Sequence, residues 1–211
     1  MKTPILKLTA VLFCFALMSC NDSSVKFTAD NLTVVNRQIV DLNEEENSFS
    51  LNNQLGDGLA IINDLEFESG SLRLEIKGED VQGKSFVGIA FNVQNDSTYE
   101  AVYFRPFNFR SQEQIRREHA MQYIYHPKNT WYYLRENFEG KYEAEFPRQP
   151  EPNDWFEVVI NIDPDRVFVY DVNTQQELLR VDRLSEQVSN KVALWTGHDS
   201  KGWFRNLRVG E

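Results

Sequence analysis

Residues 156–171 read FEVVINIDPDRVFVYD. The first half of this stretch places an apolar side chain at every second position, at Phe156, Val158, Ile160 and Ile162. Because successive side chains of a β-strand point to opposite faces of a sheet, this period of two predicts a strand with one buried face. Asp163-Pro164-Asp165 is typical of a tight turn, and the alternation resumes after it. The stretch therefore predicts an antiparallel hairpin.

The same alternation recurs at residues 72–76, 89–93, 191–196 and 203–209. No stretch of ten or more residues has a helical stripe, and only Gln112–Glu118 favours a helical turn or two, within a long loop. A content of 41 % apolar and 26 % charged residues is that of a globular protein, and no linker or internal repeat divides the chain. We expect one all-β domain over residues 26–211, a two-sheet antiparallel β-sandwich of the jelly-roll type.

The first residues are typical of a secretory signal peptide. Lys2 and Lys7 precede an apolar run, Leu8–Met18, that is too short to cross a bilayer core of about 30 Å. Leu17-Met18-Ser19-Cys20 resembles the bacterial lipobox. We expect residues 1–19 to be removed, Cys20 to be lipidated and residues 20–25 to tether the body to the cell envelope, at the outer membrane of a Gram-negative bacterium. The alternative is a generic cleavage site beside an incidental cysteine.

Cysteine count and charge exclude several classes of protein. Cys14 and Cys20 are the only cysteines, so the mature chain is predicted to have no disulfide and no cysteine-ligated metal. The net charge is −10, and it becomes −12 without residues 1–19, which hold two lysines and no acidic residue. Such a balance repels a phosphate backbone, so we expect no nucleic-acid partner.

Aromatic side chains gather between residues 99 and 142, where twelve occur in 44 residues. Arginine, histidine and amide side chains are interleaved with them. A sugar needs this mixture, because one face of its ring packs on an aromatic plane while its hydroxyls take directional hydrogen bonds. Alternate aromatic side chains of a strand also fill the core of a sandwich, and we expect this of most of the twelve.

Strand parity sorts the residues around 99–105. Val102 and Phe104 form the natural inward pair, which turns Tyr99, Tyr103 and Arg105 to the opposite face, with Ala101 between them as the floor of a groove. Ala90 and Asn92 are expected to extend this face. The alternative for Tyr103 and Arg105 is a half-buried ring beside a surface salt bridge. Glu100 shares the inward parity, so it either ends its strand in solvent or is a buried carboxylate with a partner.

His119 and His126 are two of three histidines, and they fit three interpretations: hydrogen bonding to a ligand, capping of a loop, or binding a metal. No third histidine or cysteine lies near them, so no metal is predicted. Asp163–Asp165 and Asn92–Asp96 offer oxygen ligands that leave a structural calcium open, although both are typical of ordinary turns. We therefore predict no cofactor.

Several stretches together resemble a known family: GIAFNV at 88–93, YEAVYFRPFN at 99–108, HAMQY at 119–123, WYYLR at 131–135, DWF at 154–156 and WFRNLRV at 203–209. They resemble the concanavalin A-like lectins and glucanases, and more narrowly an exported group related to 3-keto-disaccharide hydrolases. The resemblance implies a jelly roll whose concave face receives a carbohydrate. The laminarinase-like branch carries Glu-x-Asp-x-x-Glu or Glu-x-Asp-x-Glu on one strand, and neither pattern occurs here.

The sequence therefore predicts a carbohydrate-active lipoprotein that binds a glycan or modified sugar and that either hydrolyses it or only binds it. The candidate catalytic residues are Glu100, His119 and His126. The candidate binding residues are Tyr103, Arg105, Asn108, His119, Gln122, Tyr123, His126, Trp131 and Arg135. Two alternatives remain: a non-catalytic glycan-binding or scaffolding lipoprotein of a sugar-uptake system, and a protein-contact module whose aromatic cluster is buried.

Overall fold

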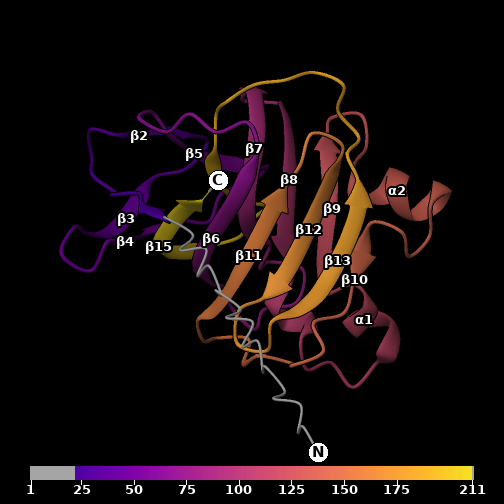
Figure 1. Ribbon diagram of the computed structural model, residues 1–211. Coiled ribbons are helices and arrows are strands. Elements are labelled where there is room, and N and C mark those ends of the chain that lie inside the picture. The colour runs from indigo at the N-terminus through magenta and orange to yellow at the C-terminus, as the bar shows by residue number, and fades with distance from the viewer. Residues whose placement is uncertain (1–21, 211) are drawn as a thin grey trace, which may run out of the picture.

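The computed structural model describes residues 22–210, which form two antiparallel sheets packed face to face (Figure 1). The first sheet has the order β13-β12-β11-β6-β15-β4-β3, and β1 pairs with β15. Its strands are β1 (Ser23–Ser24), β3 (Ile39–Asn43), β4 (Ser48–Leu51), β6 (Gly70–Lys77), β11 (Phe156–Ile162), β12 (Arg166–Asp171), β13 (Gln176–Asp182) and β15 (Gly202–Gly210). The predicted two-sheet antiparallel sandwich is confirmed.

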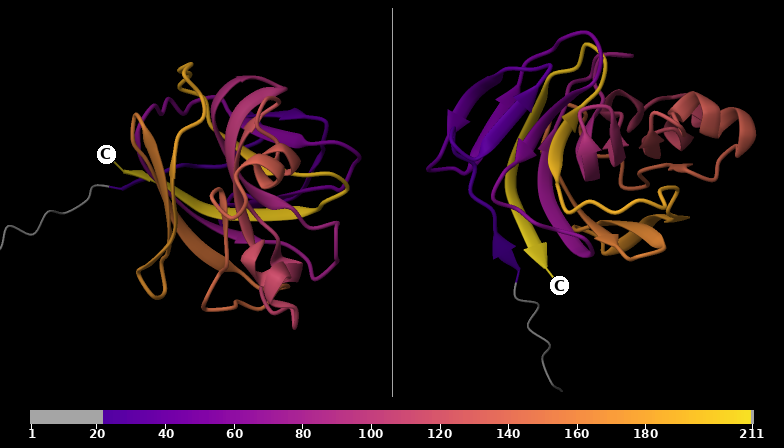
Figure 2. Two further views of the ribbon diagram at one scale, coloured as in Figure 1. Left: turned by 90° about the vertical axis from the view of Figure 1, so that its right-hand side faces the viewer. Right: turned by 90° about the horizontal axis from the view of Figure 1, so that it is seen from above.

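The second sheet has the order β10-β9-β8-β7-β14-β5-β2. Its strands are β2 (Leu32–Val35), β5 (Gly58–Ile62), β7 (Val87–Asn95), β8 (Thr98–Phe104), β9 (Met121–His126), β10 (Glu143–Ala144) and β14 (Ala193–Thr196). Three short helices, η1 (Pro106–Asn108), α1 (Gln114–Glu118) and α2 (Trp131–Asn137), connect β8, β9 and β10. Figure 2 shows the strands curving and the helices gathered at one side of the sandwich.

The predicted hairpin is present as β11 and β12. Ile162 pairs with Val167, and the backbone N–H of Asp163 donates to the carbonyl of Arg166 at 2.8 Å. The inward side chains of β11 lie in the core, where the Phe156 ring meets the Phe104 ring of β8 with 5.1 Å between centroids. Because Phe104 points toward the first sheet, its neighbours Tyr103 and Arg105 point to the outer face of the second sheet, as parity predicts.

The register of the second sheet places one row of residues across that outer face. Tyr103 on β8 pairs with Gly88 on β7, and Gly88 pairs with Trp195 on β14. On the other side Tyr103 pairs with Gln122, and Gln122 pairs with Glu143. A second row contains small or aliphatic residues: Ile124, Ala101, Ala90 and Ala193. Five strands therefore contribute to one surface.

The elements of the fold differ from the sequence prediction at the tether, at residues 131–137 and at Asn92. Ser23 and Ser24, expected in a tether, pair with β15 as strand β1. Residues 131–137 form a helix that their aromatic content did not predict. Asn92 has a positive φ, of 51°, and the register between β7 and β8 shifts between Phe91 and Asn95. This shift turns Asn92 into the sandwich, so the prediction that it extends the outer face is wrong.

The signal peptide and Cys20 lie outside the described residues. Within residues 22–210, no helix is long and apolar enough to cross a membrane.

Candidate functional site

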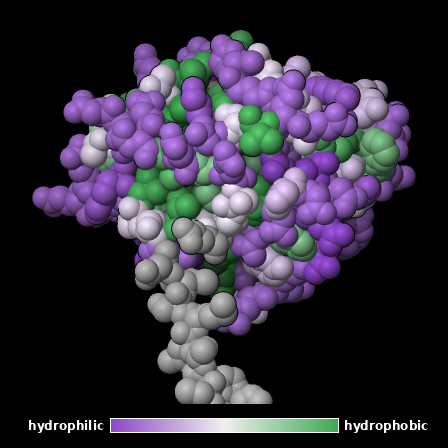
Figure 3. All heavy atoms as spheres, turned by 45° about the horizontal axis from the view of Figure 1, so that its top comes forward, coloured by the Kyte–Doolittle hydropathy of each residue, from purple (hydrophilic) through white to green (hydrophobic). Residues whose placement is uncertain are grey.

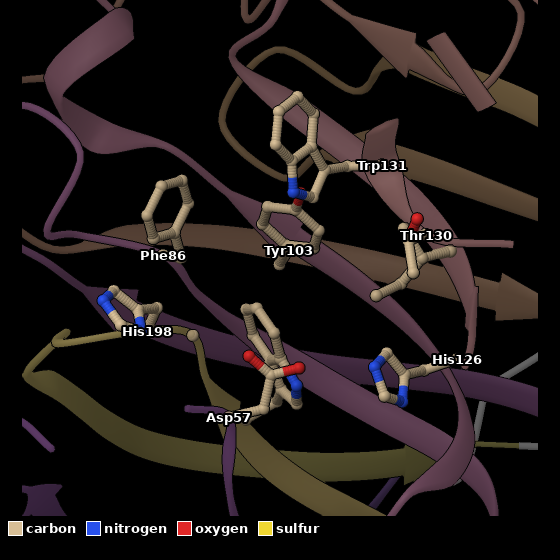
Figure 4. Close-up of a pocket in the computed structure, with 10 residues that line it drawn as sticks. Asp57, Phe86, Tyr103, His126, Thr130, Trp131 and His198 are labelled. Carbon is tan, nitrogen blue, oxygen red and sulfur yellow. The ribbon is translucent and has the colours of Figure 1, made fainter. Parts of the chain in front are cut away.

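A pocket of about 180 Å³ lies on the outer face of the second sheet, beside the N-terminus of α2 (Figure 4). It is lined by Asp57, Phe86, Tyr103, Ile124, His126, Thr130, Trp131, Trp195, Gly197 and His198. These residues come from β8, β9, β14, α2 and the loops that flank β5, β7 and β14. Four aromatic rings therefore share one small cavity with a carboxylate and two imidazoles.

Gly88 lets two of these rings meet. Tyr103 and Trp195 stand on the strands either side of Gly88, and their ring centroids are only 4.8 Å apart. A Cβ atom at Gly88 would lie 2.1 Å from the carbonyl oxygen of Val102 and 2.6 Å from the Cα of Tyr103. Phe86 meets Tyr103 edge to face at 6.1 Å. The rings thus form a continuous aromatic wall that a residue with a side chain at position 88 would disrupt.

Tyr99 orients a carboxylate of the pocket. Its hydroxyl donates to Asp57 Oδ2 at 2.8 Å and accepts from Trp195 Nε1 at 3.1 Å. Burial above all, and then the Asp57 charge, raise the pKa of Tyr99 above its ordinary 10, so the hydroxyl remains a donor. Because β7 lies between β8 and β14, the Tyr99 side chain crosses it on the outer face. Ala101 is accordingly buried, and the expected groove floor is covered by the chain's own side chains.

The two imidazoles offer complementary groups. His126 Nδ1 lies 2.8 Å from the carbonyl of Ser97, which accepts only, so Nδ1 carries the proton and Nε2 is left as an acceptor. His198 Nδ1 accepts from the backbone N–H of Gly56 at 3.2 Å, so its Nε2 is a donor. Figure 4 shows His126 and His198 on opposite sides of Asp57. The pocket rim therefore offers a donor on one side and acceptors in the centre and on the other.

Arg37 fixes the two loops that carry Asp57 and His198. Its side chain is buried and forms no ion pair with any of residues 22–210, but donates to the carbonyls of Gly56 at 2.8 Å and Gly197 at 2.7 Å. It also donates to the Thr196 hydroxyl at 2.8 Å. These bonds satisfy a buried guanidinium with carbonyl oxygens and hold both loops in place.

Of the predicted binding residues, Tyr103, His126 and Trp131 line the pocket. Arg105 and Gln122 lie behind it. Arg105 is buried and donates to the Tyr103 hydroxyl at 2.8 Å and to Gln122 Oε1 at 3.3 Å. It therefore supports the aromatic wall, and the surface salt bridge considered for it is absent from the described residues.

Asn108, His119 and Arg135 lie toward β10 and α1. The side chains of Asn108 and Arg105 both donate to the His119 carbonyl, at 3.2 and 2.8 Å. The His119 ring lines a second cavity, of about 280 Å³, with Ile115, Glu118, Glu139, Gly140, Glu143, Ala144 and Glu145. Its Nδ1 is 2.7 Å from Glu143 Oε2, and burial lowers the pKa of His119 below its ordinary 6.5. His119 and His126 therefore serve different cavities.

Arg135 connects this second cavity to the pocket. Its Nη2 donates to Glu143 Oε2 at 2.7 Å, and its guanidinium carbon is 5.2 Å from the centroid of the Trp131 ring. Glu143 is almost fully buried while the Arg135 side chain is 30 % exposed, so the carboxylate end of the pair is the one shielded from solvent. Arg135 thus positions Trp131 without lining the pocket itself.

Glu100 and Tyr123 are buried in the core between the sheets, so the predicted binding residue Tyr123 and the candidate catalytic residue Glu100 do not line the pocket. Glu100 accepts from Asn92 Nδ2 and Arg183 Nη2, both at 2.6 Å, and from the Tyr123 hydroxyl. Tyr123 pairs with the inward Val102, and burial raises its pKa well above the ordinary value. The interpretation of Glu100 as a buried carboxylate with a partner is the one that the structure supports.

Sequence reasoning did not find Asp57, Phe86, Trp195 and His198. All four lie outside the aromatic segment 99–142, and the sheet order brings them to it. Residues 22–210 contain no group of three or more His, Cys, Asp and Glu placed to hold a metal. The absence of a cofactor stays a prediction.

Solved structures share this fold at low sequence identity. A carbohydrate-binding module, CBM66 from Bacillus subtilis, matches with a TM-score of 0.60 and 13 % identity over 85 % of this chain and 96 % of that one. The exoplasmic/lumenal domain of VIP36, solved with Ca²⁺ and Man3GlcNAc, matches with a TM-score of 0.56 and 6 % identity over 85 % of this chain and 83 % of that one. A prokaryotic β-1,3-1,4-glucanase from a mouse hindgut metagenome matches with a TM-score of 0.55 and 10 % identity over 90 % of this chain and 97 % of that one.

No family model and no curated protein matches the chain. The structural likenesses confirm the concanavalin A-like fold that the sequence resembles. The narrower group related to 3-keto-disaccharide hydrolases stays a prediction. At such low identities the likeness establishes the fold alone.

Proposed function

We propose that this protein binds a glycan in the pocket between Trp131, Tyr103 and Trp195, and that it does so without hydrolysing it. The observation that carries the proposal is the aromatic wall set against a convergent polar rim. The rim supplies the Asp57 carboxylate, the His126 acceptor and the His198 donor within one pocket. The fold supports the proposal, because a carbohydrate-binding module and a glycan-bound lumenal domain share it.

A sugar ring fits this arrangement better than an apolar ligand. Its C–H face packs on an aromatic plane, and its hydroxyls both donate and accept hydrogen bonds. The cavity is smaller than the roughly 300–1,000 Å³ of pockets for drug-sized ligands, so it suits one ring. Asp57 would accept from a hydroxyl, while His198 would donate to one.

The carboxylates argue for binding rather than hydrolysis. Glycoside hydrolysis ordinarily needs two carboxyl groups, about 5–5.5 Å apart in retaining enzymes and about 6.5–9.5 Å in inverting ones. Among residues 22–210, Asp57 is the one carboxylate that lines the pocket. Glu100 is in the core, and Glu143 is bonded to Arg135. His126, a candidate catalytic residue, does line the pocket. The test of binding therefore includes a measurement of glycan hydrolysis.

A glycan array and calorimetry test the proposal. The probes include β-1,3- and β-1,4-glucans, mannans, fructans and 3-keto-disaccharides, and each bound probe is then titrated calorimetrically. Trp131→Ala and Asp57→Asn should each weaken binding at least tenfold, whereas Glu118→Gln, in the second cavity, should leave it unchanged. No binding by any probe, or equal binding by all variants, would contradict the proposal. Release of reducing sugar would contradict the non-catalytic part of it.

We further propose that lipid at Cys20 holds this body at a membrane, as expected of a glycan-binding lipoprotein of a sugar-uptake system. Strand β1 begins at Ser23, so only Asn21 and Asp22 would separate it from the anchor. Two extended residues span roughly 7 Å, which would keep the sandwich against the bilayer surface. Mass spectrometry of the mature N-terminus should find an acylated Cys20, and Cys20→Ala should release the protein from the membrane fraction. An unmodified N-terminus would contradict this.

A further inference from the structure

Four large aromatic side chains stand exposed on and just after α2. Trp131 is 46 % exposed, Tyr132 60 %, Tyr133 43 % and Phe138 43 %. They make up half of the large apolar side chains exposed in residues 22–210, and the other four are scattered singly along the chain. We call them the aromatic ledge. The face drawn in Figure 3 is largely hydrophilic, with apolar side chains in patches between polar ones. A concentration of exposed aromatic side chains of this kind marks an interaction site.

The ledge is held in place from beneath. The Thr130 hydroxyl caps α2 by accepting from the backbone N–H of Tyr133 at 3.4 Å. Leu134 is buried and anchors the helix on its inner side. Arg135, bonded to the buried Glu143, lies against one side of the Trp131 ring. The Trp131 ring, which Arg135 holds while it is half exposed, therefore loses little conformational entropy when a ligand covers it.

The ledge is continuous with the pocket. Trp131 lines the pocket and is also half exposed, so part of its ring lies outside the cavity. The Tyr132 ring meets Trp131 edge to face, with centroids 5.8 Å apart and planes at 83°. Tyr133 and Phe138 form a second pair, with 6.4 Å between ring centroids. A chain that leaves the pocket over Trp131 therefore reaches Tyr132 next.

From this continuity we infer that the aromatic ledge binds the sugar units that follow the one in the pocket, so that the ligand is an oligosaccharide held by one end. The inference rests on the proposed function. The pocket has room for one ring, and the ledge supplies stacking planes outside it. A membrane surface is a poorer occupant of the ledge, because anionic headgroups repel a chain of net charge −10 even where lipid at Cys20 holds it near the bilayer.

Affinity as a function of chain length tests the inference. The probes are glucose, mannose and the β-1,3-glucan, β-1,4-glucan and α-mannan oligosaccharides of two to four units, titrated calorimetrically against the full-length protein. In a series that binds, the disaccharide should bind about tenfold more tightly than the monosaccharide. Tyr132→Ala should remove this gain and leave monosaccharide affinity unchanged. Tyr132→Trp should keep it, and Val188→Ala, which removes an exposed side chain elsewhere, should change neither affinity.

The outcomes separate the two proposals. If oligosaccharides bind and Tyr132→Ala has no effect on the gain with length, the ledge inference is overturned and the pocket stands. If monosaccharides and oligosaccharides bind with equal affinity, the ledge inference is likewise overturned and the pocket proposal stands. If no probe binds, both proposals fail. If sedimentation shows a dimer that Tyr132→Ala converts to monomers, the ledge contacts a second copy of this chain, and the inference is overturned.

Discussion

The rings of Tyr103 on β8 and Trp195 on β14 meet across the intervening strand, with 4.8 Å between centroids and planes tilted by 34°, above a glycine that leaves them room. The two residues are 92 positions apart in the sequence. Their contact makes the aromatic wall of the pocket a property of the sheet order rather than of any one segment. It also makes the pocket sensitive to the residue between them.

Gly88→Ala should be severely destabilising. The added Cβ would meet backbone atoms of β8, at 2.1 Å from Val102 O and 2.6 Å from Tyr103 Cα, which cannot move without breaking the ladder. We expect a loss of about 3 kcal/mol in the free energy of unfolding, measured by urea denaturation. Gly83→Ala is the control, because nothing lies within 4 Å of its added Cβ and only its positive φ is penalised, by about 1 kcal/mol. Equal losses would contradict the account.

Tyr99→Phe should weaken both stability and glycan affinity. It removes the hydroxyl that joins Asp57 to Trp195, leaving the indole N–H without this acceptor. We expect a loss of roughly 1–2 kcal/mol in the free energy of unfolding and a severalfold loss of affinity. Tyr170→Phe provides the matched control, because its hydroxyl bonds Glu177 at the surface, at 3.2 Å. Unchanged affinity in Tyr99→Phe would show that Asp57 needs no positioning.

Glu100→Gln should affect folding and not binding. The substitution leaves Arg183, whose side chain is 8 % exposed, without its charge partner inside the sandwich. Breaking a buried pair in this way costs about 3–5 kcal/mol. The exposed pair of Arg180 with Glu177 is the comparison, and Glu177→Gln should cost less than about 1 kcal/mol. Glycan affinity measured below the melting range should match the wild type, whereas its loss would place Glu100 in the site after all.

His119 should make the fold less stable in mild acid. Burial lowers its pKa in the folded state, so the unfolded chain binds the proton more readily as the pH falls through 6.5. Stability is therefore complete above the unfolded pKa and decreases below it. Glu143, Arg135 and Arg105 are the charged groups that act on this ring. Urea unfolding at pH 7.5 and 5.5 should show a larger decrease for the wild type than for His119→Gln, and equal decreases would refute the prediction.

The sequence predicted the strands well because each buried face repeats with period two. It also predicted the outward direction of Tyr103 correctly. It failed at Asn92, because a single residue with positive φ reverses the alternation and leaves no trace in the apolar pattern. Tyr123 was misplaced for a related reason: its direction depends on pairing with Val102, and that register is not visible in one strand.

The sequence predicted the pocket residues that lie in the aromatic segment 99–142, but not those that lie elsewhere in the chain. Tyr103, His126 and Trp131 belong to the aromatic segment that composition singles out. Asp57 and His198 lie in turns far from it in the sequence, and only the order β8-β7-β14-β5 brings them to the same pocket. Such long-range strand pairing depends on the whole sheet, so no local sequence motif predicts it.

The most direct test of the account is a structure of the protein with a bound oligosaccharide from the array. We expect one sugar ring packed between Trp131 and the Tyr103–Trp195 wall, with a hydroxyl on Asp57 and the next unit over Tyr132. A glycan bound elsewhere, such as in the cavity around His119, with the pocket empty, would contradict it.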